Sequence, residues 1–443
     1  MNFASGYFLI FLPVLLLVFQ RVPGSYRPWL LLVASYGFYA AFHPVAVLLL
    51  LAVTLSAYVA GRYGRRYSMV YAMGILIPFG SLFFCKYYGF FRENVAGWLP
   101  LPMLQILLPA GISFYTFQAV SYVIDVHKRR IEPEENLLYM ALFVCFFPQL
   151  VAGPIERAAD LLPQLHRLTE ERPMAWREQI PLLLRGYAKK ILVADYLAIY
   201  VTRVFDAPGE QNGWSALLGA VLFTIQIYAD FSGYSDIAVA TAGMFGVGLS
   251  QNFCHPYRAV GIRDFWSRWH RTLTRWFTDY VYIPLGGNRR GPARLYLNLM
   301  VVFLLSGFWH GAAWHFVVWG LLHGVAMCLE RCAKARGLSL PRWCGRGLTL
   351  VFVAAAWVFF RAKTVGDAMT LLLAMVTKWQ GGIDLQWWAV LYGVAVILLM
   401  VYLDREEHEP SAVENMVLYF LILGGWLHLL ARTGGNTFLY FQF

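Results

Sequence analysis

Apolar runs about as long as a bilayer is thick recur along the whole chain, from Phe8 to its last residues. A helix needs about 20 apolar residues to cross the hydrocarbon core, and helices satisfy their own backbone there. Soluble domains carry about 25% charged residues, whereas this chain carries 14% and is 59% hydrophobic. We therefore expect an all-α, polytopic membrane protein that forms one integral domain over residues 1–443.

About ten to twelve apolar segments are expected to be spans or half-spans. The first, Tyr7–Gln20, lacks a basic n-region and a small-residue cleavage site, which indicates a retained span rather than a signal peptide. Basic residues follow alternate segments near the N-terminus, and this predicts that those loops face the cytoplasm. The later apolar runs, from which these spans and half-spans would form, are Trp29–Phe42, Pro44–Ala60, Ser68–Cys85, Leu104–Val126, Leu137–Val151, Ile180–Phe205, Leu217–Ile227, Ile237–Leu249, Leu295–Cys328, Leu348–Phe360, Ala368–Val376, Trp387–Leu403 and Asn415–Leu430.

The charge and cysteine patterns narrow the classes of partner. Basic loops beside anionic membrane lipid account for the formal net charge of +11. Basic residues do not alternate with aromatic residues on a soluble face, which argues against a nucleic-acid partner. The six cysteines include no C-x-x-C pair, and no zinc spacing is completed, so we expect no metal site.

The stretch Ile262–Tyr280 reads as one strongly amphipathic helix, suited to a membrane interface or a water-filled vestibule. His270 falls at the edge of its apolar side, beside Phe277, and is expected to point into the protein. The apolar side holds Ile262, Phe265, Trp266, Trp269, Leu273, Trp276, Phe277 and Tyr280. The polar side holds Asp264, Arg268, Arg271, Arg275 and Asp279.

The apolar run Leu295–Cys328 is too long for a single crossing. It predicts two spans or a broken helix, with the break near Gly307 or Gly311. His310 then lies at membrane depth, where an imidazole is costly unless it faces a cavity or a partner. A functional role is therefore expected for His310.

Proline and glycine predict another break in Phe146–Pro154.

Polar residues interrupt the apolar sequence between Leu217 and Leu249. Asp230, Ser232 and Asp236 lie there within seven residues. Intramembrane polar groups often mark a substrate path, so a polar lining is one interpretation. Polar contacts between helices are the other, and the sequence leaves both open.

Five motifs occur in order along the chain: Pro148–Ile155, Asp230–Asp236, Phe265–His270, Tyr282–Arg289 and Gly307–Gly311. With them the chain resembles the membrane-bound O-acyltransferase family, and in particular its bacterial branch of alginate O-acetyltransferase-like subunits. The resemblance extends to the closing Phe438–Phe443, where Leu stands in place of a common Ile. It implies about eleven transmembrane helices, with re-entrant or interfacial helices around a central funnel, in the bacterial inner membrane.

The same resemblance implies a reaction. A short acyl group, expected to be acetyl, passes from a cytoplasmic thioester to a secreted polysaccharide, directly or through a periplasmic or surface partner. The thioester is acetyl-coenzyme A or an acyl carrier protein, and no bound cofactor is expected. One alternative is a transporter that exports a polymer or an acyl carrier without chemistry. Another is a non-catalytic scaffold for a synthase complex.

Acyl transfer to a hydroxyl needs a base for the proton and donors for the developing oxyanion. His310 matches the catalytic histidine of the family and is the predicted base. His270 matches the second histidine, and is expected to orient the acceptor, bind the donor or stabilise charge. A histidine bonded to a neighbour is the alternative for each. Trp309 and Asn298 are further candidates for the lining of the substrate path.

Three arginines on the polar side of Ile262–Tyr280 are predicted to attract an anionic donor, although a solvated cationic face explains them equally well. They are Arg268, Arg271 and Arg275.

Tyr440 is a separate hypothesis. In the related D-alanylation system a small partner carries a similar aromatic peptide, so Tyr440 is predicted to relay the acyl group. An aromatic anchor at the membrane interface is the alternative.

Overall fold

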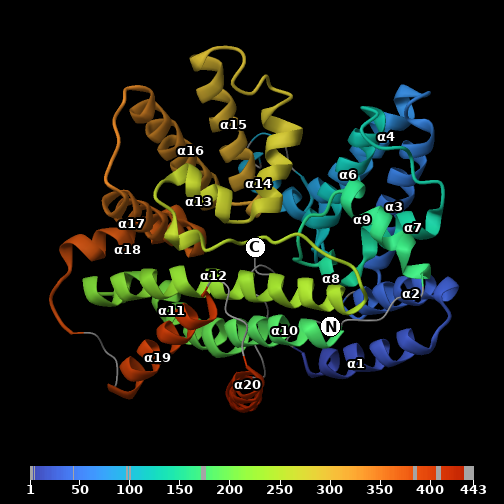
Figure 1. The fold of residues 1–443 in the computed structure, drawn as a ribbon. Coiled ribbons are helices and arrows are strands. Elements are labelled where there is room, and N and C mark those ends of the chain that lie inside the picture. The colour runs from blue at the N-terminus through green and yellow to red at the C-terminus, as the bar shows by residue number, and fades with distance from the viewer. Residues whose placement is uncertain are drawn as a thin grey trace. The chain divides into compact units, whose positions relative to one another are not determined.

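The computed structural model describes residues 3, 5–42, 44–95, 98, 101–170, 176–382, 387–405 and 411–433. Every long regular element within these ranges is a helix, and they contain no strand (Figure 1). The all-α prediction is therefore confirmed. Tyr440 lies outside the described residues, so its relay role stays a prediction.

Six helices in the described ranges are long and apolar enough to cross a membrane. They are Ala46–Tyr63 (α3), Ser68–Val95 (α4 and α5), Gly213–Met244 (α12), Pro292–His310 (α15), Trp314–Ala335 (α16) and Arg342–Arg361 (α17). Shorter apolar helices include α1 (Gly6–Arg21), α18 (Val365–Thr377) and parts of α19 (Trp387–Leu403) and α20 (Ala412–Thr433). These helices agree with a polytopic membrane protein, while the central funnel and the count of about eleven spans stay predictions.

The chain divides into two compact units. The first comprises Met1–Leu183 with Tyr234–Gln251, and the second comprises Leu184–Gly233 with Asn252–Phe443. The predicted segments Leu217–Ile227 and Ile237–Leu249 fall mostly in α12, one continuous helix that contributes to both units. Whether the two units act as the predicted single domain stays open to experiment.

In the first unit, α3, α4 and α6 pack against one another, and α7 packs on α2, α3 and α9. The fifth span was predicted to begin at Leu104, but its helix begins at Ile112. Prolines at 102 and 109 disfavour helical backbone in the residues before them, which explains the later start. The remaining bounds in this unit are α2 (Arg27–Ala40), α4 (Ser68–Leu82), α5 (Tyr88–Val95), α6 (Ile112–His127), α7 (Leu137–Cys145), α8 (Phe147–Leu150) and α9 (Ala158–His166).

The predicted break in Phe146–Pro154 is confirmed, because α7 ends at Cys145 and α8 has only four residues. Phe147 packs its ring against Phe8 and Phe38, with centroids 6.5 and 5.5 Å away. This aromatic cluster holds the broken segment inside the first unit.

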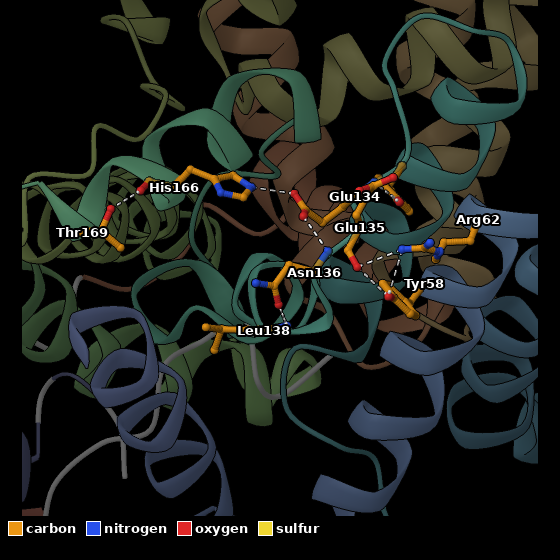
Figure 2. A network of polar contacts seen from close by, with 9 residues as sticks. Tyr58, Arg62, Glu134, Glu135, Asn136, Leu138, His166 and Thr169 are labelled. Carbon is orange, nitrogen blue, oxygen red and sulfur yellow. Dashed lines mark hydrogen bonds and ion pairs between the residues drawn. The ribbon is translucent and has the colours of Figure 1, made fainter. Parts of the chain in front are cut away.

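A polar network fixes the loop that precedes α7 (Figure 2). His166 Nε2 lies 2.8 Å from a carboxylate oxygen of Glu134. The backbone carbonyl of Glu135 accepts hydrogen bonds from the Tyr58 hydroxyl at 2.7 Å and from Arg62 Nη1 at 3.0 Å. Asn136 then caps α7 by accepting from the Leu138 backbone N–H. The loop is thus tied to α3 and α9.

In the second unit, α15 and α16 form a hairpin whose turn lies at Gly311–Ala313, so the predicted break near Gly311 is confirmed. A Cβ atom at Gly320 would lie 2.4 Å from the Phe303 carbonyl oxygen, so the two backbones meet in direct contact. The other elements are α10 (Ile180–Tyr187, which begins in the first unit), a π-helical stretch Ala188–Ala194, α11 (Asp195–Asp206), α13 (Ile262–Arg268), α14 (Arg271–Phe277) and a π-helical turn Thr278–Tyr282.

Candidate functional site

The predicted helix Ile262–Tyr280 is interrupted at His270, which corrects the expectation of one continuous helix. His270 has a φ of 42°, in the left-handed region that L residues other than glycine rarely adopt. Two backbone hydrogen bonds stabilise this corner, from Cys254 N–H to the Arg268 carbonyl at 3.0 Å and from Arg271 N–H to the Asn252 carbonyl at 2.9 Å. The segment that precedes α13 therefore determines the direction of the His270 side chain.

The predicted amphipathic pattern is present on both sides of the interruption at His270. Seven of the eight residues on the predicted apolar side are buried, and Tyr280 is half-buried. Arg271 and Arg275 on the polar side are exposed. The apolar side chains of both short helices therefore stay buried on either side of the corner.

His270 is fully buried, with a relative exposure of 0%, as the sequence predicted. Its Nδ1 lies 3.3 Å from Asn252 Oδ1, and the Thr272 hydroxyl donates to the same oxygen at 2.6 Å. A carbonyl oxygen only accepts, so His270 Nδ1 carries the proton and Nε2 carries the lone pair. Burial lowers the pKa of His270 to about 3, so the ring is neutral at physiological pH.

His310 is the last residue of α15 and is 4% exposed. The Trp319 and Phe360 rings contact its imidazole edge to face, with centroids 5.1 and 5.2 Å away. Trp309 connects the two histidines, because its ring centroid lies 4.9 Å from that of His310 and 6.2 Å from that of His270. The structure therefore brings both predicted histidines, and the predicted Trp309, into one buried cluster.

The polar residues of α12 do not act as one set. Asp230 is buried and forms an ion pair with Lys190, whose Nζ lies 2.8 Å from Asp230 Oδ1 and 2.6 Å from Asp195 Oδ1. This pairing favours the interpretation of Asp230 as a polar contact between helices. Ser232 is buried and its hydroxyl has no hydrogen-bond partner among the described residues. Asp236 is half-buried and belongs to the other unit.

Asp230 nonetheless directly precedes a residue that contacts the histidine cluster. Phe231, the following residue, contacts the His270 ring edge to face at 4.8 Å. A buried ion pair rigidifies the backbone that carries it, because separating the charges in a low dielectric is expensive. The Lys190 pair thus fixes the part of α12 that presents Phe231 to His270.

The predicted donor-binding arginines differ in their contacts and exposure. Arg268 Nε lies 2.7 Å from Asp264 Oδ1, and its Nη1 donates to the Cys254 carbonyl at 3.3 Å. Arg275 lies 3.9 Å from Asp279, a long contact at an exposed position. Arg271 is exposed. A role for Arg268 in holding the corner at His270 is therefore supported directly, whereas donor binding by the three arginines stays a prediction.

Asn298 is buried on α15 and connects that helix to the loop before it. Its Nδ2 donates to the carbonyls of Gly287 at 3.0 Å and Leu285 at 3.4 Å. His315 lies 3.0 Å from the Phe359 carbonyl through Nδ1, and the Trp266 indole N–H donates to His323 Nδ1 at 3.2 Å. These bonds support packing roles for His315 and His323.

Sequence reasoning missed the residues that hold the site in place: Asn252, Thr272, Lys190, Asp195 and Trp319. Asn252 stands next to the Phe-Trp-Ser-Arg-Trp-His motif only in space, so no local pattern marks it, whereas Thr272 follows the motif by two residues. Lys190 gave a signal, because a lysine inside the apolar run Ile180–Phe205 needs an acidic partner when it is buried.

Comparison with known proteins places the chain among transferases. Residues 132–363 match the model of the membrane-bound O-acyltransferase family, and this region includes His270 and His310. The chain is 37% identical over 400 residues to a probable alginate O-acetylase of Pseudomonas aeruginosa, covering 86% of this chain and 76% of that protein. It is 34% identical over 410 residues to a peptidoglycan O-acetyltransferase of Helicobacter pylori, covering 83% and 78%. It is 25% identical over 291 residues to a teichoic acid D-alanyltransferase of Bacillus subtilis, covering 62% and 71%.

Proposed function

Because the chain belongs to the membrane-bound O-acyltransferase family, we propose that it transfers a short acyl group, first of all acetyl, from a cytoplasmic thioester to a secreted polysaccharide. That it is a multi-pass membrane O-acyltransferase follows from the family itself. The observation that carries the proposal is the contact of Trp309 with both buried histidine rings.

The acceptor class rests on the relatives. Two of them are named for O-acetylation of alginate and of peptidoglycan, and both polymers offer sugar hydroxyls. Both polymers lie outside the cytoplasm, so the enzyme would act from the bacterial inner membrane. A periplasmic or surface partner would then receive the acyl group wherever the polymer does not reach the membrane itself.

The reaction assigned to His310 is general-base catalysis. Its imidazole takes the proton of the acceptor hydroxyl while the hydroxyl oxygen attacks the thioester carbonyl carbon. The new C–O bond forms, the C–S bond breaks, and the imidazolium returns the proton to the departing thiolate. Trp319 and Phe360 exclude water from one side of the ring, which favours transfer over hydrolysis.

His270 has a different task because it is held neutral. Its Nδ1–H faces Asn252, and at a pKa of about 3 its Nε2 accepts hydrogen bonds rather than donating them. We assign His270 to orienting the acceptor hydroxyl by accepting its hydrogen bond. It thus positions a group rather than stabilising negative charge.

The donor is proposed to be acetyl-coenzyme A or an acyl carrier protein. Purified protein in detergent, given a labelled acetyl thioester and a soluble oligosaccharide, should form labelled ester or release labelled acetate. A transporter without chemistry would act only in sealed vesicles. Label that moves across vesicles but never leaves its thioester in detergent would contradict the proposal.

The acyl relay through Tyr440 stays part of the proposal. The phenol oxygen would attack the thioester carbonyl and release the thiol, and an acceptor hydroxyl would then displace the phenol. Turnover trapped with labelled donor should yield acylated Tyr440 by mass spectrometry. A Tyr440→Phe enzyme with full transfer would remove the relay and leave Tyr440 as an interfacial anchor.

A further inference from the structure

A cavity of about 330 Å³ lies in the second unit and is lined by residues of α13, α14, α15 and α16. Most of its wall is apolar, with Leu273 and Phe277 from α14 and Leu299 and Phe303 from α15. A volume of this size accepts a small ligand or one segment of hydrocarbon chain. Neither of the clustered histidines is among the described residues that line it.

Two arginines line the same cavity, Arg263 at the start of α13 and Arg331 near the end of α16. They lie at one end of it, because the Arg263 backbone N–H donates to a carboxylate oxygen of Glu330, the neighbour of Arg331, at 3.1 Å. Among the described residues, neither guanidinium forms an ion pair. Arg263 is exposed and Arg331 half-buried, so both reach solvent or lipid headgroups.

Among the α15 residues that line the cavity, Ser306 is nearest to His310 in sequence. Ser306 precedes His310 by four residues, which is about 6 Å of axial rise in an α-helix. A molecule in the cavity therefore stops short of His310 and needs no reactive carbonyl. It needs an anionic group at the arginine end and an apolar chain along Leu299 and Phe303.

We propose that this cavity binds an anionic phospholipid, with its phosphate between Arg263 and Arg331 and one acyl chain along the apolar wall. Guanidinium groups pair well with phosphate oxygens. Basic pockets between transmembrane helices on the cytoplasmic side bind lipid headgroups. The basic residues after Arg331, among them Lys334 and Arg336, place this end of α16 on that side by the positive-inside rule.

The position of the cavity gives the lipid a regulatory role. One wall, α14, begins directly after His270, and another, α15, ends at His310. A lipid acyl chain that fills the space between these helices fixes the distance between the two histidines. This second step rests on the proposed function, whereas lipid binding itself does not.

The test compares two double variants with the same loss of charge. Arg263→Gln with Arg331→Gln removes both cations that line the cavity, and Arg336→Gln with Arg346→Gln removes two exposed cations that do not line it. Each full-length protein is placed in nanodiscs of phosphatidylcholine with or without phosphatidylglycerol that bears a photoreactive acyl chain. Labelled residues are mapped by mass spectrometry, and thermal midpoints are recorded.

In the unmodified protein and the control variant, labelling should map to the cavity, and phosphatidylglycerol should raise the thermal midpoint. The cavity variant should need about tenfold more phosphatidylglycerol for the same labelling. Equal labelling in all three proteins, or labelling that acetyl-coenzyme A displaces, would overturn the lipid site. Loss of labelling in a variant with normal transfer would retain the site and remove only its regulatory role. Labelling of a protein that transfers nothing would leave the site intact while the proposed function fails.

Discussion

Asn252 holds His270 through a contact of 3.3 Å between the amide oxygen and ring Nδ1, and the same residue accepts the backbone N–H of Arg271 through its carbonyl. One residue thus fixes both the tautomer of the imidazole and the left-handed backbone beside it. A supporting residue of this kind orients a functional group without touching the reactants.

Replacing Asn252 with Ala should lower acyl transfer about tenfold, which corresponds to roughly 1.4 kcal/mol for one lost hydrogen bond. Thr272→Val removes the hydroxyl but leaves the Asn252–His270 contact, so its loss should be smaller. Transfer rates at matched protein levels measure both effects. Equal rates for Asn252→Ala and the unmodified enzyme would show that His270 needs no such support.

The buried neutral state of His270 predicts a pH dependence of stability. Its pKa is about 3 in the folded protein against 6.5 in its ordinary state. As pH falls, the unfolded chain therefore binds the proton before the folded protein does. The stability that neutral His270 contributes is fully present above pH 6.5 and is lost as the pH falls toward 3.

His270→Asn removes this titration and tolerates the left-handed backbone. Its thermal midpoint in detergent should fall less than that of the unmodified protein between about pH 7 and about pH 5. If the two proteins lose the same number of degrees, His270 is charged or solvated in the folded state.

The buried ion pairs of Lys190 predict that a variant lacking this lysine can be restabilised by further substitutions. Lys190→Met leaves Asp195 and Asp230 buried without their cation, and breaking such a pair costs about 3–5 kcal/mol. Adding Asp195→Asn and Asp230→Asn removes the uncompensated charges and should restore most of the folded yield. Yield after extraction and thermal midpoint report the result, and a triple variant as unstable as Lys190→Met would argue against the pairing.

The hairpin of α15 and α16 predicts different outcomes at two glycines. A Cβ atom at Gly320 would lie 2.4 Å from the Phe303 carbonyl oxygen, so Gly320→Ala should force the helices apart and reduce both stability and transfer. Gly347→Ala on α17 meets no atom within 4 Å and should be neutral or stabilising, by up to about 1 kcal/mol. Thermal midpoints of the two variants test the contrast directly. Equal midpoints would contradict the close approach.

Much of this architecture could be predicted from hydrophobic periodicity. The break at Phe146, the turn near Gly311 and the burial of His270 all follow from where apolar runs and helix breakers stand. The corner at His270 could not, because its left-handed backbone depends on bonds to Asn252 and Cys254, which local sequence does not reveal. The predicted start of this span at Leu104 was wrong. The apolar residues between Pro102 and Pro109 form no helix, and α6 begins at Ile112.

The candidate site was predictable where a motif carried it and not where a tertiary contact did. His310 and Trp309 belong to one short motif, and the structure places the Trp309 ring in contact with both His310 and His270. Asp230 was predicted equally well as lining or as a helix contact, and only its ion pair with Lys190 favours the second interpretation. The pairing of distant charges is a property of the fold rather than of spacing along the chain.

The central claim is that the His310 imidazole takes the proton of the acceptor hydroxyl, and its most direct test is acyl transfer by His310→Ala from a labelled thioester in detergent. The exposed His127→Ala, made and quantified alongside, controls for the loss of any imidazole. We predict a fall of about 10²–10⁴-fold for His310→Ala at normal protein level and thermal midpoint, and no change for His127→Ala. A well-folded His310→Ala enzyme that transfers acyl groups at the unmodified rate would contradict the claim.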